Sequence, residues 1–246
     1  MIFKEFLLIY PQVFSKAQII YKGYQDKFIQ LMDTCNSITC RKEYARGGLG
    51  MGLGYYWANP MKDRVVGGVH RGRLLKHINS RIKPDWEYCF DPNGKIVAAQ
   101  EDLSNNPIMH FFLYDIDEYV WELVFDSNRE LERISVVFFR NCLIELELVF
   151  TPHSFGEEEE IFMNSRYEAW IFEYLNQEII EFEYFWDFLY PEKASDFLSK
   201  YGLNNQLIRK VFKKHTDDEG DSVKYDLFEI NESTKECRFV MTQTLK

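Results

Sequence analysis

The chain has 246 residues, of which 46% are hydrophobic and 17% aromatic. This apolar content is enough for a packed core and excludes a globally disordered chain. No apolar run approaches the roughly 18 residues that a membrane-spanning helix needs, so we expect no such helix. The aromatic load favours pleated, half-buried surfaces and therefore β-sheet.

Charge is divided unevenly along the chain. Residues 1–84 carry 14 Lys/Arg and 5 Asp/Glu, residues 85–246 carry 15 and 34, and the formal net charge of the whole is −10. A basic first third followed by an acidic remainder predicts two surfaces with different partners. We expect a single domain over residues 1–246, with a boundary near residue 84 as the alternative.

Cysteine usage indicates a reducing compartment. The five cysteines are Cys35, Cys40, Cys89, Cys142 and Cys237. Their number is odd and none form a C-x-x-C pair, which favours reduced thiols over a disulfide framework. Cys89 and Cys142 are expected inside apolar strands, and only Cys35 and Cys40 are close enough in sequence to pair. The apolar start at residues 1–11 lacks a cationic leader, so we predict a cytoplasmic protein without a signal peptide.

The N-terminal third combines helical spacing with a glycine-rich segment. Apolar residues recur at three- and four-residue steps over residues 11–34, which predicts a helix. Residues 41–84 hold eight of the 13 glycines and are rich in Lys and Arg, so a loop or irregular extended segment is expected. Leu74, Leu75, Ile78 and Ile82 share one helical face, which predicts a short basic amphipathic helix.

From Trp86 onward the apolar period changes to two. Trp86–Phe90 and Lys95–Ala99 flank the sequence Asp91-Pro92-Asn93-Gly94, which is a strong hairpin signal. Short connections between the next segments favour an antiparallel meander. These further predicted strands are Met109–Tyr114, Tyr119–Phe125, Leu131–Phe139 and Leu143–Phe150.

The C-terminal part is harder to assign. Residues 157–189 mix helical and alternating spacing, and we expect helix or mixed structure first and then a strand. Ala194–Lys214 has a helical pattern, whereas Val223–Ile230 and Glu236–Thr242 predict a closing hairpin. The fold class expected is therefore α+β, with an antiparallel meander, an N-terminal helix and C-terminal helices.

Catalytic and cofactor motifs are absent from the sequence. The glycine run Gly48–Gly54 has no preceding strand, no Gly-Lys-Ser/Thr ending and no βαβ context, so we do not predict a phosphate-binding loop. The five histidines lack metal-ligand spacing, and no Gly-x-Ser-x-Gly elbow is present. We therefore predict no catalytic residue, no metal site and no cofactor. A hydrolase acting on a phosphate-containing substrate through His70, Arg71 and Arg73 stays an alternative.

The basic segment offers another alternative, a nucleic-acid-binding regulator acting through residues 41–83. Lys and Arg side chains neutralise phosphates, and Tyr55, Tyr56 and Trp57 are able to stack on bases. The candidate anion-binding residues are Arg71, Arg73 and Arg81. The net charge of −10 opposes nucleic acid at long range.

Several predicted strands alternate carboxylates with apolar residues. Glu122 follows this pattern, as do Glu145 and Glu147, and Glu181 and Glu183. A period of two places the carboxylates on one face of a sheet. Ordinary solubility explains such a face, and so does a negative field used to attract a basic partner.

In layout, the chain resembles bacterial immunity proteins of polymorphic toxin and contact-dependent inhibition systems. The resemblance rests on the meander from Trp86–Lys95 to Leu143–Phe150, with its acidic turns and many aromatic residues. It implies a non-enzymatic cytosolic protein that neutralises a cognate toxin domain by capping a basic surface. The partner-binding residues expected are Asp115, Asp117, Glu118, Glu122, Glu157, Glu158 and Glu159.

Overall fold

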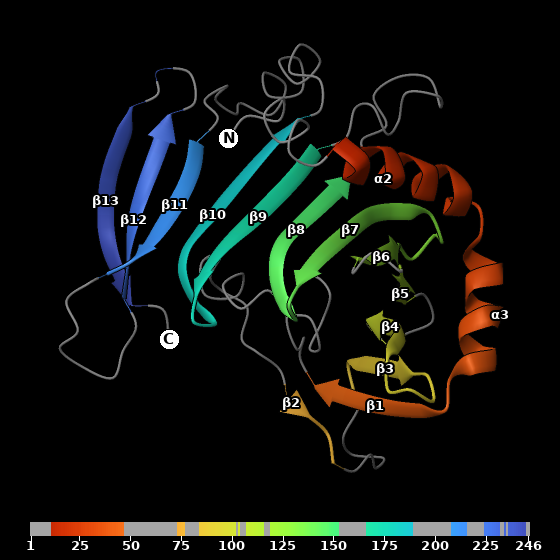
Figure 1. The fold of residues 1–246 in the computed structure, drawn as a ribbon. Coiled ribbons are helices and arrows are strands. Elements are labelled where there is room, and N and C mark those ends of the chain that lie inside the picture. Colours follow the sequence, from red (N-terminus) through yellow and green to blue (C-terminus); the bar gives the residue numbers. More distant parts are fainter. Residues whose placement is uncertain are drawn as a thin grey trace. The chain divides into compact units, whose positions relative to one another are not determined.

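The computed structural model describes eleven parts of the chain, most of which contain the helices and strands given below (Figure 1). These parts are residues 11–46, 73–76, 84–101, 103, 107–115, 119–152, 166–188, 208–215, 224–231, 234 and 236–244. Of the helices in these parts, none has the length and apolar character needed to cross a membrane.

Two short helices replace the single helix expected over residues 11–34. They are α2 (Pro11–Tyr24) and α3 (Phe28–Ile38). The break falls where the helical hydrogen bonding changes, with the Lys27 N–H donating to the carbonyl of Tyr24. Helix α3 buries Leu31 and packs the Phe28 ring edge-on against aromatic rings of the sheet.

Within the described residues, thirteen strands form one sheet, in the order β13-β12-β11-β10-β9-β8-β7-β6-β5-β4-β3-β1-β2. Neighbours from β3 to β13 are consecutive in sequence, so the predicted meander is confirmed. The strands are β1 (Arg41–Arg46), β2 (Arg73–Leu74), β3 (Trp86–Phe90), β4 (Ile96–Glu101), β5 (Ile108–Tyr114), β6 (Tyr119–Phe125), β7 (Leu131–Arg140), β8 (Leu143–Thr151), β9 (Arg166–Leu175), β10 (Glu178–Phe188), β11 (Ile208–Lys214), β12 (Lys224–Asn231) and β13 (Cys237–Thr244).

Of the expected α+β class, the antiparallel sheet and the N-terminal helices are confirmed, whereas the C-terminal helices are not. The helix expected over Ala194–Lys214 is wrong for residues 208–214, which form β11, and its earlier part lies outside the described residues. The helix expected first within residues 157–189 is wrong where β9 lies. Apolar side chains on both faces of β9 imitated helical spacing, because this strand is buried on both sides.

Two assignments in the basic segment also change. Residues 41–46 form strand β1 rather than a loop, and Ala45 within it is fully buried. Arg73 and Leu74 pair with β1 as strand β2, so the expected amphipathic helix does not begin there. Leu75 and Lys76 are not helical either, whereas residues 77–83 and the glycine run 47–54 lie outside the described residues.

The chain divides into two compact units, one formed by residues 19–137 and the other by residues 1–18 and 138–246. In the first unit, strand β6 is buried along its whole length. Phe28 of α3 covers one face of this part of the sheet at Phe111 and Phe125. In the second unit, buried aromatic side chains run across β9 to β12, with the Phe182 and Phe212 rings stacked 4.5 Å apart.

The hairpin turns explain the order of the strands. Asp91 Oδ1 accepts hydrogen bonds from the N–H groups of Asn93 and Lys95, at 2.9 and 2.8 Å. Asp126 Oδ1 makes the same two bonds, to Asn128 and Glu130. The fourth residue of each turn is left-handed, Gly94 with φ 79° and Arg129 with φ 69°. These turns return the chain directly beside the strand it has left, which produces a meander.

We predict that Gly94→Ala lowers the free energy of unfolding by about 1 kcal/mol, because an L side chain is strained at positive φ. Space is not the cause, since a Cβ at Gly94 meets nothing within 4 Å. Gly23→Ala is the matched control, because Gly23 lies in helix α2 and a Cβ added there also meets nothing within 4 Å. This control should be stabilising by about 0.5 to 1 kcal/mol. Urea denaturation measures both, and equal effects would contradict the prediction.

Candidate functional site

The sequence-predicted partner residues do not form one described surface. Glu122 is 0% exposed, so its prediction as a surface contact is wrong: β6 is buried on both faces, and the carboxylate points into the core. Asp115 is half-buried after β5, and Arg73 is exposed on β2. Three strands separate β2 from β5 in the sheet, so these two are not strand neighbours. Seven predicted residues lie outside the described residues: Asp117, Glu118, Glu157, Glu158, Glu159, Arg71 and Arg81.

The alternating carboxylates of the strands are largely neutralised within the sheet. Lys213 and Lys214 of β11 pair with Glu181 and Glu178 of β10, at 3.0 and 2.7 Å. Further ion pairs join Arg140 to Glu145 and Arg238 to Glu229. Glu147 is 1% exposed. The predicted placement of Glu122 and Glu147 on an exposed carboxylate face is therefore wrong, since both are buried. The sequence pattern predicts a helix over residues 208–214, so it does not place Lys213 and Lys214 beside Glu181 and Glu178 of β10.

A buried histidine–glutamate pair lies in the core of the first unit. His110 of β5 and Glu122 of β6 are joined at 2.7 Å through Nδ1 and Oε1, and both are almost fully buried. The ring of Trp86 lies 5.4 Å from that of His110. The other ring nitrogen of His110, Nε2, lies 3.8 Å from Oε2 of Glu101, whose side chain is 42% exposed.

Two carboxylates around one imidazole favour its charged form. Burial by itself lowers the pKa of His110, but the nearby carboxylates of Glu101 and Glu122 outweigh burial and the repulsion from Arg133, so the pKa is raised. The sequence alone does not reveal the His110–Glu122 pair, because finding it requires the register between β5 and β6. The register that sets Phe112 opposite Glu122 places His110 on the same face as Glu122.

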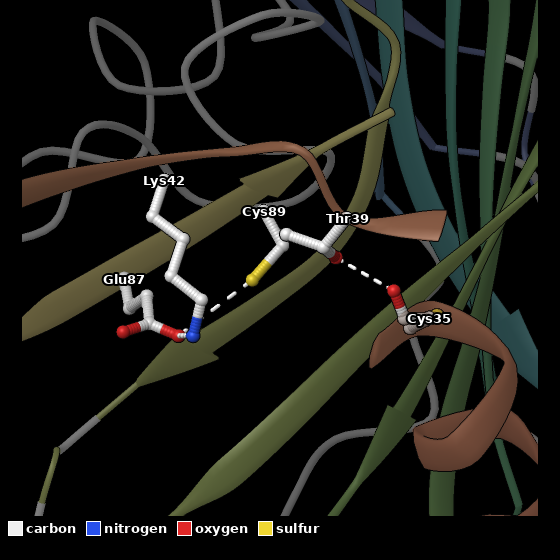
Figure 2. A network of polar contacts seen from close by, with 5 residues as sticks. All are labelled: Cys35, Thr39, Lys42, Glu87 and Cys89. Atoms are coloured by element: carbon white, nitrogen blue, oxygen red, sulfur yellow. Dashed lines mark hydrogen bonds and ion pairs between the residues drawn. The ribbon is translucent and has the colours of Figure 1, made fainter. Parts of the chain in front are cut away.

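A second polar network lies on β1, β3 and the end of α3 (Figure 2). Lys42 Nζ donates to Oε1 of Glu87 at 2.6 Å, and the thiol of Cys89 lies 3.6 Å from the same oxygen. At the helix end, the hydroxyl of Thr39 donates to the carbonyl of Cys35 at 2.6 Å. Hydrogen bonding to Glu87 raises the pKa of Lys42.

The thiols of this network are poor nucleophiles. Burial, with a further contribution from Cys89, raises the pKa of Cys35 to about 12. Burial and then the Glu87 carboxylate raise the pKa of Cys89 to about 11. Thiolate is the reactive form, so neither group supports nucleophilic catalysis near neutral pH. All five cysteines are free, and Cys142 is exposed in a turn rather than buried in a strand as expected.

Strand β13 of the second unit carries exposed apolar side chains and lies at one end of the described sheet. Among the described strands it pairs with β12 alone. Phe239 is 54% exposed and Met241 is 48% exposed. The strand at the opposite end, β2, has two residues within the described part of the chain. Natural sheets protect their outer strands by shortness or charge, so the eight-residue β13 is the less protected end.

Within the described ranges, no group of three or more His, Cys, Asp or Glu side chains is arranged to hold a metal ion. Comparisons of the chain with family models, with curated proteins and with solved structures found no match. The candidate site therefore rests on the geometry of β13 and on the two polar networks.

The buried pair makes a prediction about pH. Because the pKa of His110 is raised above 6.5, its charged form stabilises the fold fully below pH 6.5. That stabilisation is lost as pH rises through the folded pKa. Denaturation at several pH values should show this fall in the wild type and not in His110→Phe.

His110→Phe should also cost about 3 kcal/mol at pH 6, because Glu122 stays buried without the imidazole. The double variant His110→Phe/Glu122→Leu is the matched control and should recover part of that loss. Equal stability of the single and double variants would contradict the role assigned to the pair.

The thiols give an independent prediction. At pH 8, an alkylating reagent should modify Cys40, Cys142 and Cys237 rapidly, because all three are exposed. Cys35 and Cys89 should react at least about tenfold more slowly, since burial and a raised pKa both suppress the thiolate. Mass spectrometry of timed samples measures each site separately, and denatured protein should react at all five.

Proposed function

We propose that the chain is a non-enzymatic protein-binding module whose partner is a basic protein. The observation that carries the proposal is strand β13, an eight-residue outer strand with the exposed apolar side chains Phe239 and Met241. Exposed apolar side chains on an unprotected outer strand are typical of protein interfaces. Aromatic side chains of this kind commonly supply much of the binding energy.

The charge of the chain supports a basic partner. Its formal net charge is −10, and a field of that sign accelerates the encounter with positively charged proteins. Two basic residues of strand β1 favour this proposal over nucleic-acid binding. Arg41 and Lys42 pair with Glu43 and Glu87 of the same chain, so these cations are already neutralised.

Within this class, the partner we propose is a cognate toxin domain, as the resemblance to immunity proteins implies. The protein would act in the cytoplasm, without a cofactor, by capping the basic surface of that domain. Asp115, with Asp117 and Glu118 after it, would steer association rather than anchor it, because surface charges mainly govern association rates.

The test is capture from lysate of the source cells, using the tagged full-length chain at low and at moderate salt. We expect one basic protein in fixed stoichiometry, recovered better at low salt. Mass spectrometry and nucleic-acid detection are applied to the same eluate. Nucleic acid with a steep salt dependence would instead favour the regulator acting through residues 41–83.

A charge-reversal variant sharpens this test. Asp115→Lys/Asp117→Lys/Glu118→Lys should slow association with the captured protein and reduce its salt dependence. The matched control reverses Glu132, an exposed carboxylate on β7. An unchanged association rate in the triple variant would count against electrostatic steering by residues 115–118.

A further inference from the structure

We propose that the partner contributes an extended segment that pairs with β13 as an additional strand of the sheet. This inference rests on the proposed function and specifies how the partner is held. The added strand would take up backbone hydrogen bonds of β13 and cover the side chain of Phe239. Strand addition of this kind gives affinity through the main chain and specificity through alternate side chains.

The alternation of hydrogen-bonded and non-hydrogen-bonded pairs between β12 and β13 identifies the backbone groups of β13 that can bond to an added strand. The N–H of Asn231 donates to the carbonyl of Glu236 at 3.0 Å, so these two residues form a hydrogen-bonded pair. In an antiparallel ladder, hydrogen-bonded and non-hydrogen-bonded pairs alternate. Arg238 therefore bonds toward β12, whereas the N–H and C=O groups of Cys237 and Phe239 point away from β12, toward the open side.

The side chains beside these groups form a small apolar surface. Phe239 lies opposite Phe228, and their rings meet edge-to-face with centroids 5.7 Å apart. Cys237 lies opposite Ile230 on the same face. The register shifts at Leu227 and Phe228, so Met241 is aligned with Leu227 on the other face. An added strand thus meets an apolar side chain on each face.

The occupant that fits is a segment of a basic protein rather than a second copy of this chain. Glu236 is exposed at the start of β13 and suits a cationic residue flanking the added strand. The net charge of −10 opposes self-association. Antiparallel pairing of two β13 strands through Cys237 and Phe239 would set Arg238 opposite its own copy, and like charges in that position are destabilising.

The test uses the full-length chain and a defined probe, the capped synthetic peptide Lys-Val-Thr-Val-Thr-Val-Lys. Binding should slow hydrogen exchange at the backbone amides of Cys237 and Phe239. A peptide N-methylated at alternate residues cannot pair along one side and should bind at least about tenfold more weakly. A peptide with glutamate in place of both lysines should also bind more weakly. Equal binding of all three peptides would overturn the inference.

A backbone variant provides the matched experiment on the protein. Cys237→Pro removes an outward N–H and leaves the bonds between Arg238 and β12 in place, and proline is tolerated on outer strands. It should weaken peptide binding about tenfold, whereas Cys237→Ala should stay within about twofold of the wild type. Unchanged exchange at the Arg238 amide verifies that the hairpin is intact. Equal affinity of the two variants would overturn strand addition.

The outcomes separate this inference from the proposed function. A basic protein captured equally well by Cys237→Pro and Cys237→Ala would support the function and overturn strand addition. Peptide binding at β13 without a basic protein from lysate would support the site and overturn the function. Concentration-dependent protection of the Cys237 and Phe239 amides without any peptide would indicate a second copy and overturn the inference.

Discussion

The antiparallel hydrogen-bond ladder, closed by short turns, is the constraint on which the rest of the structure depends. Each short turn returns the chain beside the strand it has just left, and in an antiparallel pair the side-chain period of two then fixes which residues share a face. At Asn141–Cys142 and Asn176–Gln177 both turn residues are left-handed, with φ between 51° and 69°. Such two-residue turns match the natural twist of the strands, so they set the register of β7 with β8 and of β9 with β10.

Burial on both faces of the sheet makes some polar side chains structural. Strand β6 is buried throughout, and Glu122 lies within it at a position where alternation alone predicts an outward carboxylate. The cost of burying this charge is offset by His110 at 2.7 Å and by the raised pKa of the imidazole. The sheet therefore uses a polar pair in its core, and the acidity of the sequence does not translate directly into an acidic surface.

The parts of the fold that the sequence predicts are those determined by local turn residues and local alternation of apolar side chains. The strands from Trp86 to Phe150 could be predicted, because turn chemistry and alternation agree there. Strand β9 could not, because apolar residues on both of its faces imitate helical spacing. The lysines of β11 also follow a helical pattern, and only their pairing with Glu178 and Glu181 explains them. That information lies in neighbouring strands rather than in the local sequence.

The candidate site likewise has one part that the local sequence predicts and another that depends on neighbouring strands. Phe239 and Met241 lie in a strand that the sequence predicts, and among the described strands it pairs with β12 alone. The exposed aromatic side chain at this position was therefore accessible to sequence reasoning, which instead favoured carboxylates. Charged residues can be read directly from the sequence, whereas their ion-pair partners cannot. The neutralisation of these carboxylates by cross-strand lysines and arginines appears only in three dimensions.

The two ends of the sheet differ in a way that bears on function. Strand β2 offers two described residues, one of them Arg73, whereas β13 offers eight, with Arg238 as its single arginine. An added strand gains more backbone hydrogen bonds at the longer end and meets Phe239 without displacing a charge. Because the gain from each hydrogen bond is modest, affinity at this end would depend on the combination of backbone pairing and burial of the Phe239 ring.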